Sequence, residues 1–232
     1  VDNDPDQLLE LCRDAGTEEV RLAHDSITSY LGALGARRGA VIASGTGVVT
    51  LAVGVDRVAR VDGWGNIMGD AGSGYWIGRE ALDAVMRAHD GRGPATALSQ
   101  VVTARFPRLD QAYIELQTDP DQVAVVGSFA VAVSELATSD GVAAAICRRA
   151  GEELALSASA AARAVGLERP AVCLVGAVFG SDAVRSACLD ALERRVPGFR
   201  PVPARGEGID GAEALLTLPA GHPLASEVSV AG

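Results

Sequence analysis

Residues 62–78 read DGWGNIMGDAGSGYWIG and contain six glycines, both tryptophans of the chain and the acid Asp70. Glycine at this density is expected where the backbone takes positive φ or approaches another group closely, so the segment should be neither a regular helix nor a strand. A flexible loop would be rich in serine and poor in tryptophan. The segment therefore predicts an ordered, concave loop that holds a small polar ligand and runs into a helix at about Ser73.

The composition around this loop limits the classes of function. The 232 residues are 48% hydrophobic, which predicts one large or two small domains with a buried core. The net charge of −10 argues against a nucleic-acid partner. All twenty basic residues are arginine, so mechanisms that need a lysine amine are excluded. Any bound phosphate must be held by backbone amides, hydroxyls, arginine or a metal.

Three further features concern location and metals. No apolar run approaches eighteen residues and no signal peptide is recognisable, so we expect no membrane contact. The cysteines form no Cys-x-x-Cys pair and predict buried thiols in a reducing cytoplasm: Cys12, Cys147, Cys173 and Cys188. The three histidines are scattered, and we expect no metal site built by the protein.

Hydrophobic periodicity and glycine or proline breaks predict an α/β chain with an all-helical insert over residues 75–166. Helices are expected at 5–15, 26–34, 73–89, 95–106, 121–137, 142–165, 181–195 and 209–218. Strands are expected at 19–24, 39–44, 48–53, 58–61, 170–175 and 199–202. Residues 108–119 are expected to be a less regular connection, and the tail from Pro219 is expected to be frayed.

Glycine-bearing turns follow three of these strands, at Gly45-Thr46-Gly47, at the glycine loop and at Gly176. The first joins two strands and predicts an anion-binding nest, although a plain hairpin turn would look the same. Asp25 also stands at a strand end, where it is either a functional acid or the N-cap of the next helix. Ligands collect at the carboxyl ends of strands in such sheets. A carboxylate, a phosphate nest and a sugar-like pocket together predict phosphoryl transfer to a hydroxyl group.

Four segments carry a resemblance to a known family: residues 22–26 (LAHDS), 43–47 (ASGTG), 63–78, and 149–152 (RAGE). Together they resemble the N-acetylglucosamine kinase family of BadF/BadG/BcrA/BcrD-type ATPases, within the sugar kinase, Hsp70 and actin superfamily. The resemblance covers about residues 5–217. It implies two ribonuclease-H-like lobes with a cleft between them, and phosphorylation of N-acetylglucosamine or glucosamine with ATP and Mg²⁺.

The same resemblance implies roles for individual residues. Asp25 would be the general base on the sugar hydroxyl. The β- and γ-phosphates of ATP would be held by Gly45, Thr46 and Gly47, and the adenosine by Ala150 and Gly176. The amino sugar would be held by Gly63, Trp64, Gly65 and Asp70.

The sequence departs from the family pattern at two places. The family has Asn before the base, where this chain has His24. The family also opens with an Asp-Gly-Gly-Gly-Thr phosphate loop that has no counterpart here, which predicts an incomplete first lobe. The expected domains are thus the remainder of the first lobe (1–72), a second lobe with the helical insert (73–217) and a tail (218–232).

Two alternatives to an amino-sugar kinase remain open from the sequence. One is a sugar- or nucleotide-binding pseudokinase that lacks the first phosphate loop. The other is an ATPase activase of a radical acyl-CoA enzyme, which would need an iron–sulfur cluster on paired cysteines. The expected partners are the amino sugar and ATP, with no nucleic acid and no membrane, and a homodimer through the helical insert is a further expectation.

Overall fold

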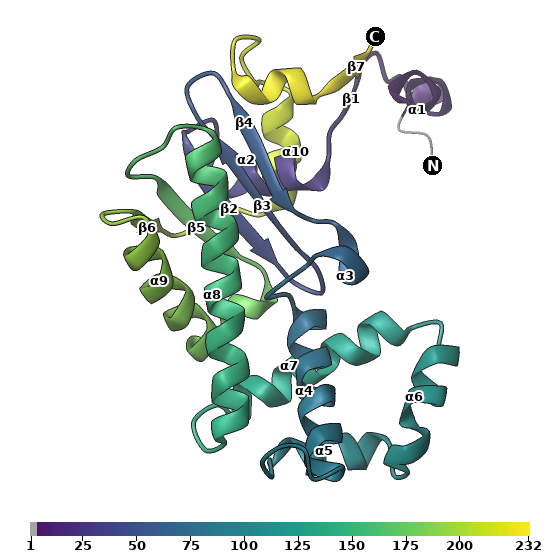
Figure 1. Cartoon of the computed structure of the whole chain (residues 1–232). Helices are drawn as coiled ribbons and strands as arrows, with labels where there is room; N and C mark the ends of the chain where they lie inside the picture. The colour runs from purple at the N-terminus through teal and green to yellow at the C-terminus, as the bar shows by residue number, and fades with distance from the viewer. Residues whose placement is uncertain (1–3) are drawn as a thin grey trace.

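A five-stranded mixed sheet forms the centre of the molecule (Figure 1). The structure is a computed structural model that describes residues 4–232. The strands are β2 (Gly39–Ser44), β3 (Val48–Val53), β4 (Val58–Asp62), β5 (Ala171–Val175) and β6 (Arg200–Val202). They lie in the order β4-β3-β2-β5-β6; the first three are antiparallel neighbours, and β5 and β6 continue the sheet parallel to β2. The expected α/β class is confirmed.

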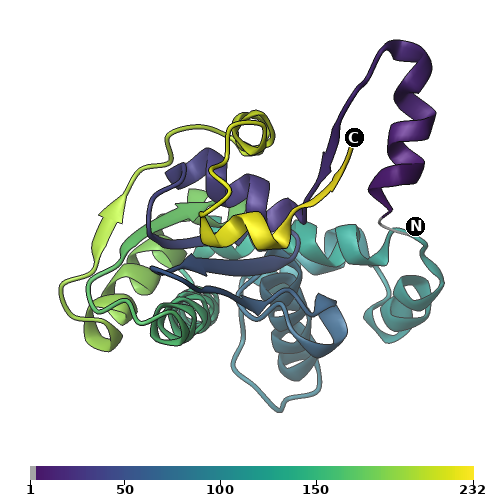
Figure 2. The ribbon, with the colours of Figure 1, turned by 90° about the horizontal axis from the view of Figure 1, so that it is seen from above.

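Two pairs of helices cover the faces of this sheet. They are α8 (Gly141–Ala164) with α9 (Asp182–Arg195), and α2 (Asp25–Leu34) with α10 (Gly208–Leu215). Successive side chains of a strand point to opposite faces. Ile42 accordingly packs in the core that includes α8 and α9, and its neighbour Val41 packs in the core that includes α2 and α10. Figure 2 shows the sheet between these two layers.

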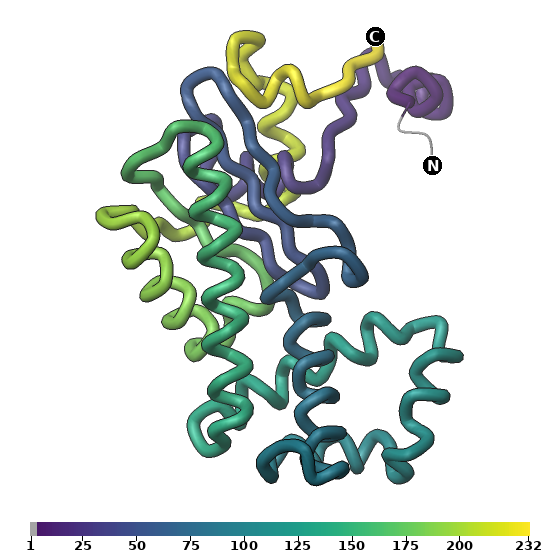
Figure 3. Tube along the Cα trace, viewed as in Figure 1, coloured from purple at the N-terminus to yellow at the C-terminus, as the bar shows by residue number. Residues whose placement is uncertain are grey.

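A group of helices extends beyond the sheet, as the tube in Figure 3 shows. It comprises α4 (Gly74–His89), α5 (Leu98–Arg105), α6 (Leu109–Thr118) and α7 (Gln122–Leu136). Together with the first part of α8, these helices are the expected insert. α4 and α7 cross closely because Gly78 has no side chain: a Cβ there would lie 1.8 Å from the carbonyl oxygen of Val126.

Helix α6 corrects the expectation that residues 108–119 are irregular. Leu109, Ala112 and Leu116 recur at helical spacing and pack against the main core. Three apolar side chains on one face are sufficient once the neighbouring α7 provides a surface to cover.

An early strand and the last strand form a separate two-stranded ribbon. β1 (Val20–Leu22) pairs antiparallel with β7 (Ser229–Ala231), next to α1 (Pro5–Cys12). The tail from Pro219 is therefore not frayed in the structure. Leu224 is fully buried in a short 3-10 helix, Pro223–Glu227, and this apolar anchor holds the last strand in place.

The central sheet takes strands from both sides of the expected domain boundary at residues 72 and 73, since β2 pairs with β5. Of the two ribonuclease-H-like lobes that the resemblance implies, residues 4–232 contain one such sheet, and the other sheet is the two-stranded ribbon. No single helix in this part of the chain is long and apolar enough to cross a membrane; α7 and α8 pass that test only as a pair bent by 113°.

Candidate active site

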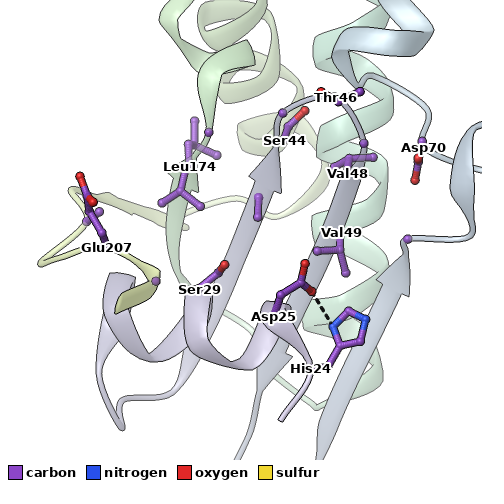
Figure 4. Close-up of a pocket in the computed structure, with 18 of the residues that line it drawn as sticks. His24, Asp25, Ser29, Ser44, Thr46, Val48, Val49, Asp70, Leu174 and Glu207 are labelled. Carbon is purple, nitrogen blue, oxygen red and sulfur yellow. Dashed lines mark ion pairs between the residues drawn. The ribbon is translucent and has the colours of Figure 1, made fainter. Parts of the chain in front are cut away.

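A cavity of about 820 Å³ lies at the ends of β2 and β5. Its walls come from five places: the start of α2, the β2–β3 turn, the glycine loop, the end of β5 and the segment leading into α10 (Figure 4). Eight of the ten predicted site residues line it: Asp25, Gly45, Thr46, Gly47, Gly63, Gly65, Asp70 and Gly176. Residues far apart in the sequence are thus brought to one pocket, at the edge where an α/β sheet collects its ligands.

The β2–β3 turn is fixed by the helix that follows the glycine loop. The first amides of α4 have no partner inside the helix. Those of Gly74 and Tyr75 donate to the carbonyl oxygens of Gly45 and Thr46, at 2.8 and 3.0 Å. The amide of Gly45 donates within the turn to the carbonyl of Gly47, at 2.9 Å, so it cannot also bind an anion. Any phosphate contact of this turn must come from the Thr46 hydroxyl and the remaining amides.

Gly47 is required by the carboxylate of Asp70, not by its own backbone angles. A Cβ at position 47 would lie 2.8 Å from Oδ2 of Asp70, and the φ of Gly47 is not positive. The pKa of Asp70 is raised above its ordinary value, mainly by burial and also by the charge of Asp62. Hydrogen bonds from the amides of Val48 and Gly65 act in the opposite direction and reduce the shift. The carboxylate therefore links the phosphate-type turn to the glycine loop while facing the cavity.

Asp62 holds the glycine loop in shape. Its Oδ1 accepts hydrogen bonds from the amides of Gly63 and Asp70, at 2.9 and 2.7 Å. Asp62 and Asp70 both have positive φ, a conformation that acidic side chains tolerate better than most. Between them the chain forms one helical turn, α3 (Gly65–Met68). The expectation that the loop contains no regular helix is therefore wrong for these four residues.

The alternative that Asp25 is the N-cap of α2 is wrong. The cap is His24, whose Nδ1 accepts from the amide of Ser26 at 3.2 Å. Asp25 is the first residue of the helix, and its side chain is 88% exposed and lies 2.8 Å from the same nitrogen. Its carboxylate faces the cavity opened by the strand ends (Figure 4). Helix capping therefore does not explain why an acid stands here.

Two glycine contacts fix where α2 and α10 sit beside the cavity. A Cβ on Gly32 would lie 1.9 Å from the carbonyl oxygen of Glu207, and one on Gly211 would lie 1.8 Å from that of Thr28. The helices therefore cross backbone to backbone. This close crossing places Asp25, at the start of α2, across the cavity from Glu207, which precedes α10.

Two predicted site residues do not line this cavity. Trp64 is 56% exposed and stacks under the guanidinium of Arg60, 5.5 Å from the ring centre. Ala150 is completely buried in α8, where its carbonyl packs against Gly72 of the glycine loop. Gly176 does line the cavity, and it is also needed for packing: its φ is +103°, and a Cβ there would lie 2.2 Å from the carbonyl of Ser44.

A second cavity, of about 330 Å³, also borders the Gly45-Thr46 turn. Its walls are mostly apolar and include Val131 of α7 and Val178, which follows β5. Cys147, one turn before Ala150 in α8, also lines it, and burial raises the pKa of its thiol. A flat, largely apolar group attached to a phosphate at Thr46 would have room here.

Sequence reasoning missed several residues of the two cavities. In the larger one they are Ser29, Ala204, Gly206, Glu207 and Gly208, and in the smaller one they include Ser134, Glu135 and Ser181. Those of the 204–208 segment carry no motif, and only the α2–α10 crossing brings them to the pocket. His24 differs from the asparagine of the family pattern, and its residue type does not predict that it caps α2 through Nδ1.

Comparison with known proteins identifies related sequences. The model of the BadF/BadG/BcrA/BcrD ATPase family matches residues 11–216. An N-acetylmuramic acid/N-acetylglucosamine kinase of Clostridium acetobutylicum is 29% identical over 171 residues, 68% of this chain and 53% of that protein. An N-acetyl-D-glucosamine kinase of Dictyostelium discoideum is 44% identical over 69 residues, 29% of this chain and 22% of that protein.

Solved structures agree with these sequence relatives. A Chromobacterium violaceum protein, provisionally named N-acetylglucosamine kinase, is 31% identical and superimposes with a TM-score of 0.65, over 84% of this chain and 64% of that one. A Porphyromonas gingivalis protein at 16% identity has a TM-score of 0.64, which supports the fold alone. This chain spans about half the length of the Clostridium relative. Because the family model covers most of its residues, the chain belongs to the BadF/BadG/BcrA/BcrD ATPase family.

Proposed function

We propose that this chain takes part in the ATP-dependent phosphorylation of an amino sugar, N-acetylglucosamine or glucosamine, with Asp25 as the general base. One observation carries the proposal: Asp25, the Gly45–Gly47 turn and Asp70 line a single cavity. Relatives with related sequences are named as kinases of these sugars. An exposed carboxylate beside a phosphate-type turn is the arrangement that transfer to a hydroxyl requires.

The proposed roles follow the positions of the groups. Asp25 accepts the proton of the attacking sugar hydroxyl. Thr46 and Gly47 hold the terminal phosphates of ATP through the hydroxyl and the free amides of their turn. Asp70 accepts hydrogen bonds from sugar hydroxyls, and Gly63 and Gly65 let the sugar approach the backbone.

The nucleoside is proposed to lie in the smaller cavity, which also borders Thr46. Val131 and Val178 offer apolar contact there. In this arrangement Gly176 borders the larger cavity near the phosphates. Ala150 is buried and does not contact the nucleoside; it lies one turn after Cys147, which lines the smaller cavity. Trp64 lies outside the larger cavity and would contact the sugar only if the sugar carries a large substituent.

The described residues do not form a protein cage for the Mg²⁺ that the family implies. No three metal-ligating side chains gather anywhere in residues 4–232. Mg²⁺ in nucleotide sites is commonly held by phosphates, waters and one or two carboxylates. The ion would therefore arrive on ATP, and none of the roles above depends on it. The four free thiols suit a reducing compartment, and we place the protein in the cytoplasm on that ground.

The test is sugar-dependent ATP turnover by the chain and by Asp25→Asn. The substitution keeps the size of the side chain and removes its basicity, so we expect the turnover rate to fall by about 10²- to 10⁴-fold. Asp56→Asn is the matched control, since Asp56 is an exposed loop acid paired only with Arg57. Undiminished turnover in Asp25→Asn would contradict the role of Asp25. Calorimetry that detects sugar binding without turnover in the unsubstituted chain would instead favour a pseudokinase.

A further inference from the structure

Three groups approach one nitrogen atom of His24. Its Nδ1 lies 2.8 Å from Oδ1 of Asp25, 2.8 Å from the hydroxyl oxygen of Ser26 and 3.2 Å from the amide nitrogen of Ser26. A bare Nδ1 has one lone pair, which can accept from Ser26, and a protonated Nδ1 has one N–H, which can be donated to Asp25. The nitrogen cannot do both. The presence of a proton on Nδ1 therefore determines whether the imidazole accepts from the Ser26 amide or donates to the Asp25 carboxylate.

No arginine competes with His24 for Asp25. Among the residues that line the larger cavity, His24 alone has a side chain that can carry positive charge. α2 packs against β2, β3 and β5, whose residues are all uncharged, and against α10. The charged groups on α10 and among the residues that line the facing walls are acids: Glu207, Asp210, Glu213 and Asp70. Arg205, in the segment before α10, lies at the other end of α2, beside Gly35. Arg21 of the preceding β1 is engaged by Glu19 and by the carbonyl of Leu215.

We propose that His24 is a positioning residue. It holds the Asp25 carboxylate when Nδ1 of the imidazole is protonated, and it releases the carboxylate when Nδ1 is bare. This inference rests on the proposed role of Asp25 as the base. With a proton on Nδ1, the imidazole donates to the carboxylate and fixes it at the start of α2. With Nδ1 bare, the imidazole caps α2, and two facing lone pairs at 2.8 Å repel, so the carboxylate turns free into the cavity.

The pH dependence follows from these two states. A carboxylate paired with imidazolium keeps its negative charge more firmly and accepts a proton less readily. Histidine side chains change charge between about pH 5 and pH 8. Proton abstraction by Asp25 is therefore weaker when Nδ1 of His24 carries a proton than when Nδ1 is bare.

The first experiment reads the imidazole directly and needs no turnover. The chain has three histidines, so the ring ¹⁵N signals of His24, His89 and His222 can be followed from pH 5 to 8 by NMR. We expect Asp25→Asn to change the protonation pattern of Nδ1 in His24. His222 caps a 3-10 helix through its own Nδ1 and forms no ion pair with an acid, so its signals should stay the same. Identical His24 signals in both proteins would overturn the proposal.

The second experiment compares His24→Asn with His222→Asn. Asparagine is a good N-cap, so each variant keeps its helix start while losing the titrating ring. We expect His24→Asn to lose one ionisation from the acid side of the kcat profile, with KM for the sugar within about twofold and an unchanged circular dichroism spectrum. His222→Asn should keep the unsubstituted profile. If His24→Asn also keeps it, the proposal fails. Absence of turnover in the unsubstituted chain would contradict the proposed function, and the NMR result would still decide this inference.

Discussion

Asp70 shows how one residue can serve both the fold and the pocket. Its carboxylate is buried against Gly47, and its backbone has positive φ. The pKa of this acid is raised above 3.8, and burial is the largest cause of the shift. The ionised carboxylate is therefore less stable in the folded chain than in the unfolded one. The residue thus costs stability at neutral pH, and perturbed pKa values of this kind cluster at functional sites.

Asp70→Asn separates the charge from the shape. Asparagine tolerates positive φ and can accept one of the two amide hydrogen bonds, so the loop should persist. We expect KM for the sugar to rise by about 10- to 100-fold, because one charge-assisted hydrogen bond is worth roughly 1.5–3 kcal/mol. The melting temperature should stay the same or rise. Steady-state kinetics with thermal melting checks both, and an unchanged KM would remove Asp70 from the sugar site.

Thr50 carries a buried hydroxyl group without a hydrogen-bond partner. It lies in the middle of β3, is completely buried, and its hydroxyl has no hydrogen-bond partner. Valine has nearly the same shape without the polar atom. We expect Thr50→Val to stabilise the chain by about 1 kcal/mol, because an unpaired buried hydroxyl costs on the order of 1–3 kcal/mol. Urea unfolding measures this difference.

Thr96→Val is the matched control for that experiment. The Thr96 hydroxyl donates to Oδ2 of Asp140 at 2.9 Å, so the same substitution should destabilise the chain there. If Thr50→Val is destabilising as well, then the Thr50 hydroxyl has a partner, such as a buried water, and the reasoning is wrong.

At the level of elements, Asp140 ties two helices together. Its Oδ1 accepts from the amides of Val142 and Ala143 at the start of α8, and its Oδ2 accepts from Thr96 and from the amide of Ala97 just before α5. Burial alone would raise the pKa of Asp140, but these hydrogen bonds outweigh it and lower the pKa below 3.8. The stability that Asp140 contributes is therefore present above about pH 4 and is lost as the pH falls further.

Asp140→Ala should destabilise the chain by about 2–3 kcal/mol, from the lost cap and the lost link to α5. Asp121→Ala is the matched control: Asp121 occupies the N-cap position of α7 but makes no capping hydrogen bond, so its loss should be within about 0.5 kcal/mol. Urea unfolding at pH 7 gives both values. Equal losses in the two variants would show that the position, not the hydrogen bonds, matters.

The elements also show which parts of the fold could be predicted from the sequence. Ser73, Ser181 and Asp140 are strong N-caps before apolar periodic runs, and the helices after them begin where expected. α6 has a weak periodicity and depends on the surface of α7. β7 has three residues and depends on its partner β1, so neither could be read locally.

The candidate site divides in the same way. Asp25, Thr46 and Asp70 belong to motifs and could be singled out from the sequence. Glu207 could not, because only the crossing of α2 and α10 brings it to the cavity. Trp64 belongs to the motif as well, yet its ring points outside, since a motif fixes residue types and leaves side-chain direction to the surrounding fold.

At the scale of the whole molecule, the arrangement of the sheet explains why the site is acidic. The cavity is built from turns and helix starts at one edge of the sheet, and the acids Asp25, Asp70 and Glu207 line it. The chain carries a net charge of −10, so no general positive field offsets them. The charge of a nucleotide bound here would therefore need to be neutralised by a cation that arrives with it.

Global stability should fall on mild acidification, through His222. Burial, opposed by a hydrogen bond with the backbone of Ala36, lowers the pKa of this residue below its usual 6.5. Between the lowered folded value and 6.5 the unfolded chain binds more protons, so stability increases with pH there and decreases as the pH falls below 6.5. One proton limits the slope to about 1.4 kcal/mol per pH unit.

In urea unfolding from pH 8 to 5, His222→Asn should remove this component while keeping the helix cap, and His89→Asn, at an exposed position, should leave it intact. If His222→Asn loses as much stability as the unsubstituted chain over this range, the acid sensitivity arises from the carboxylates instead.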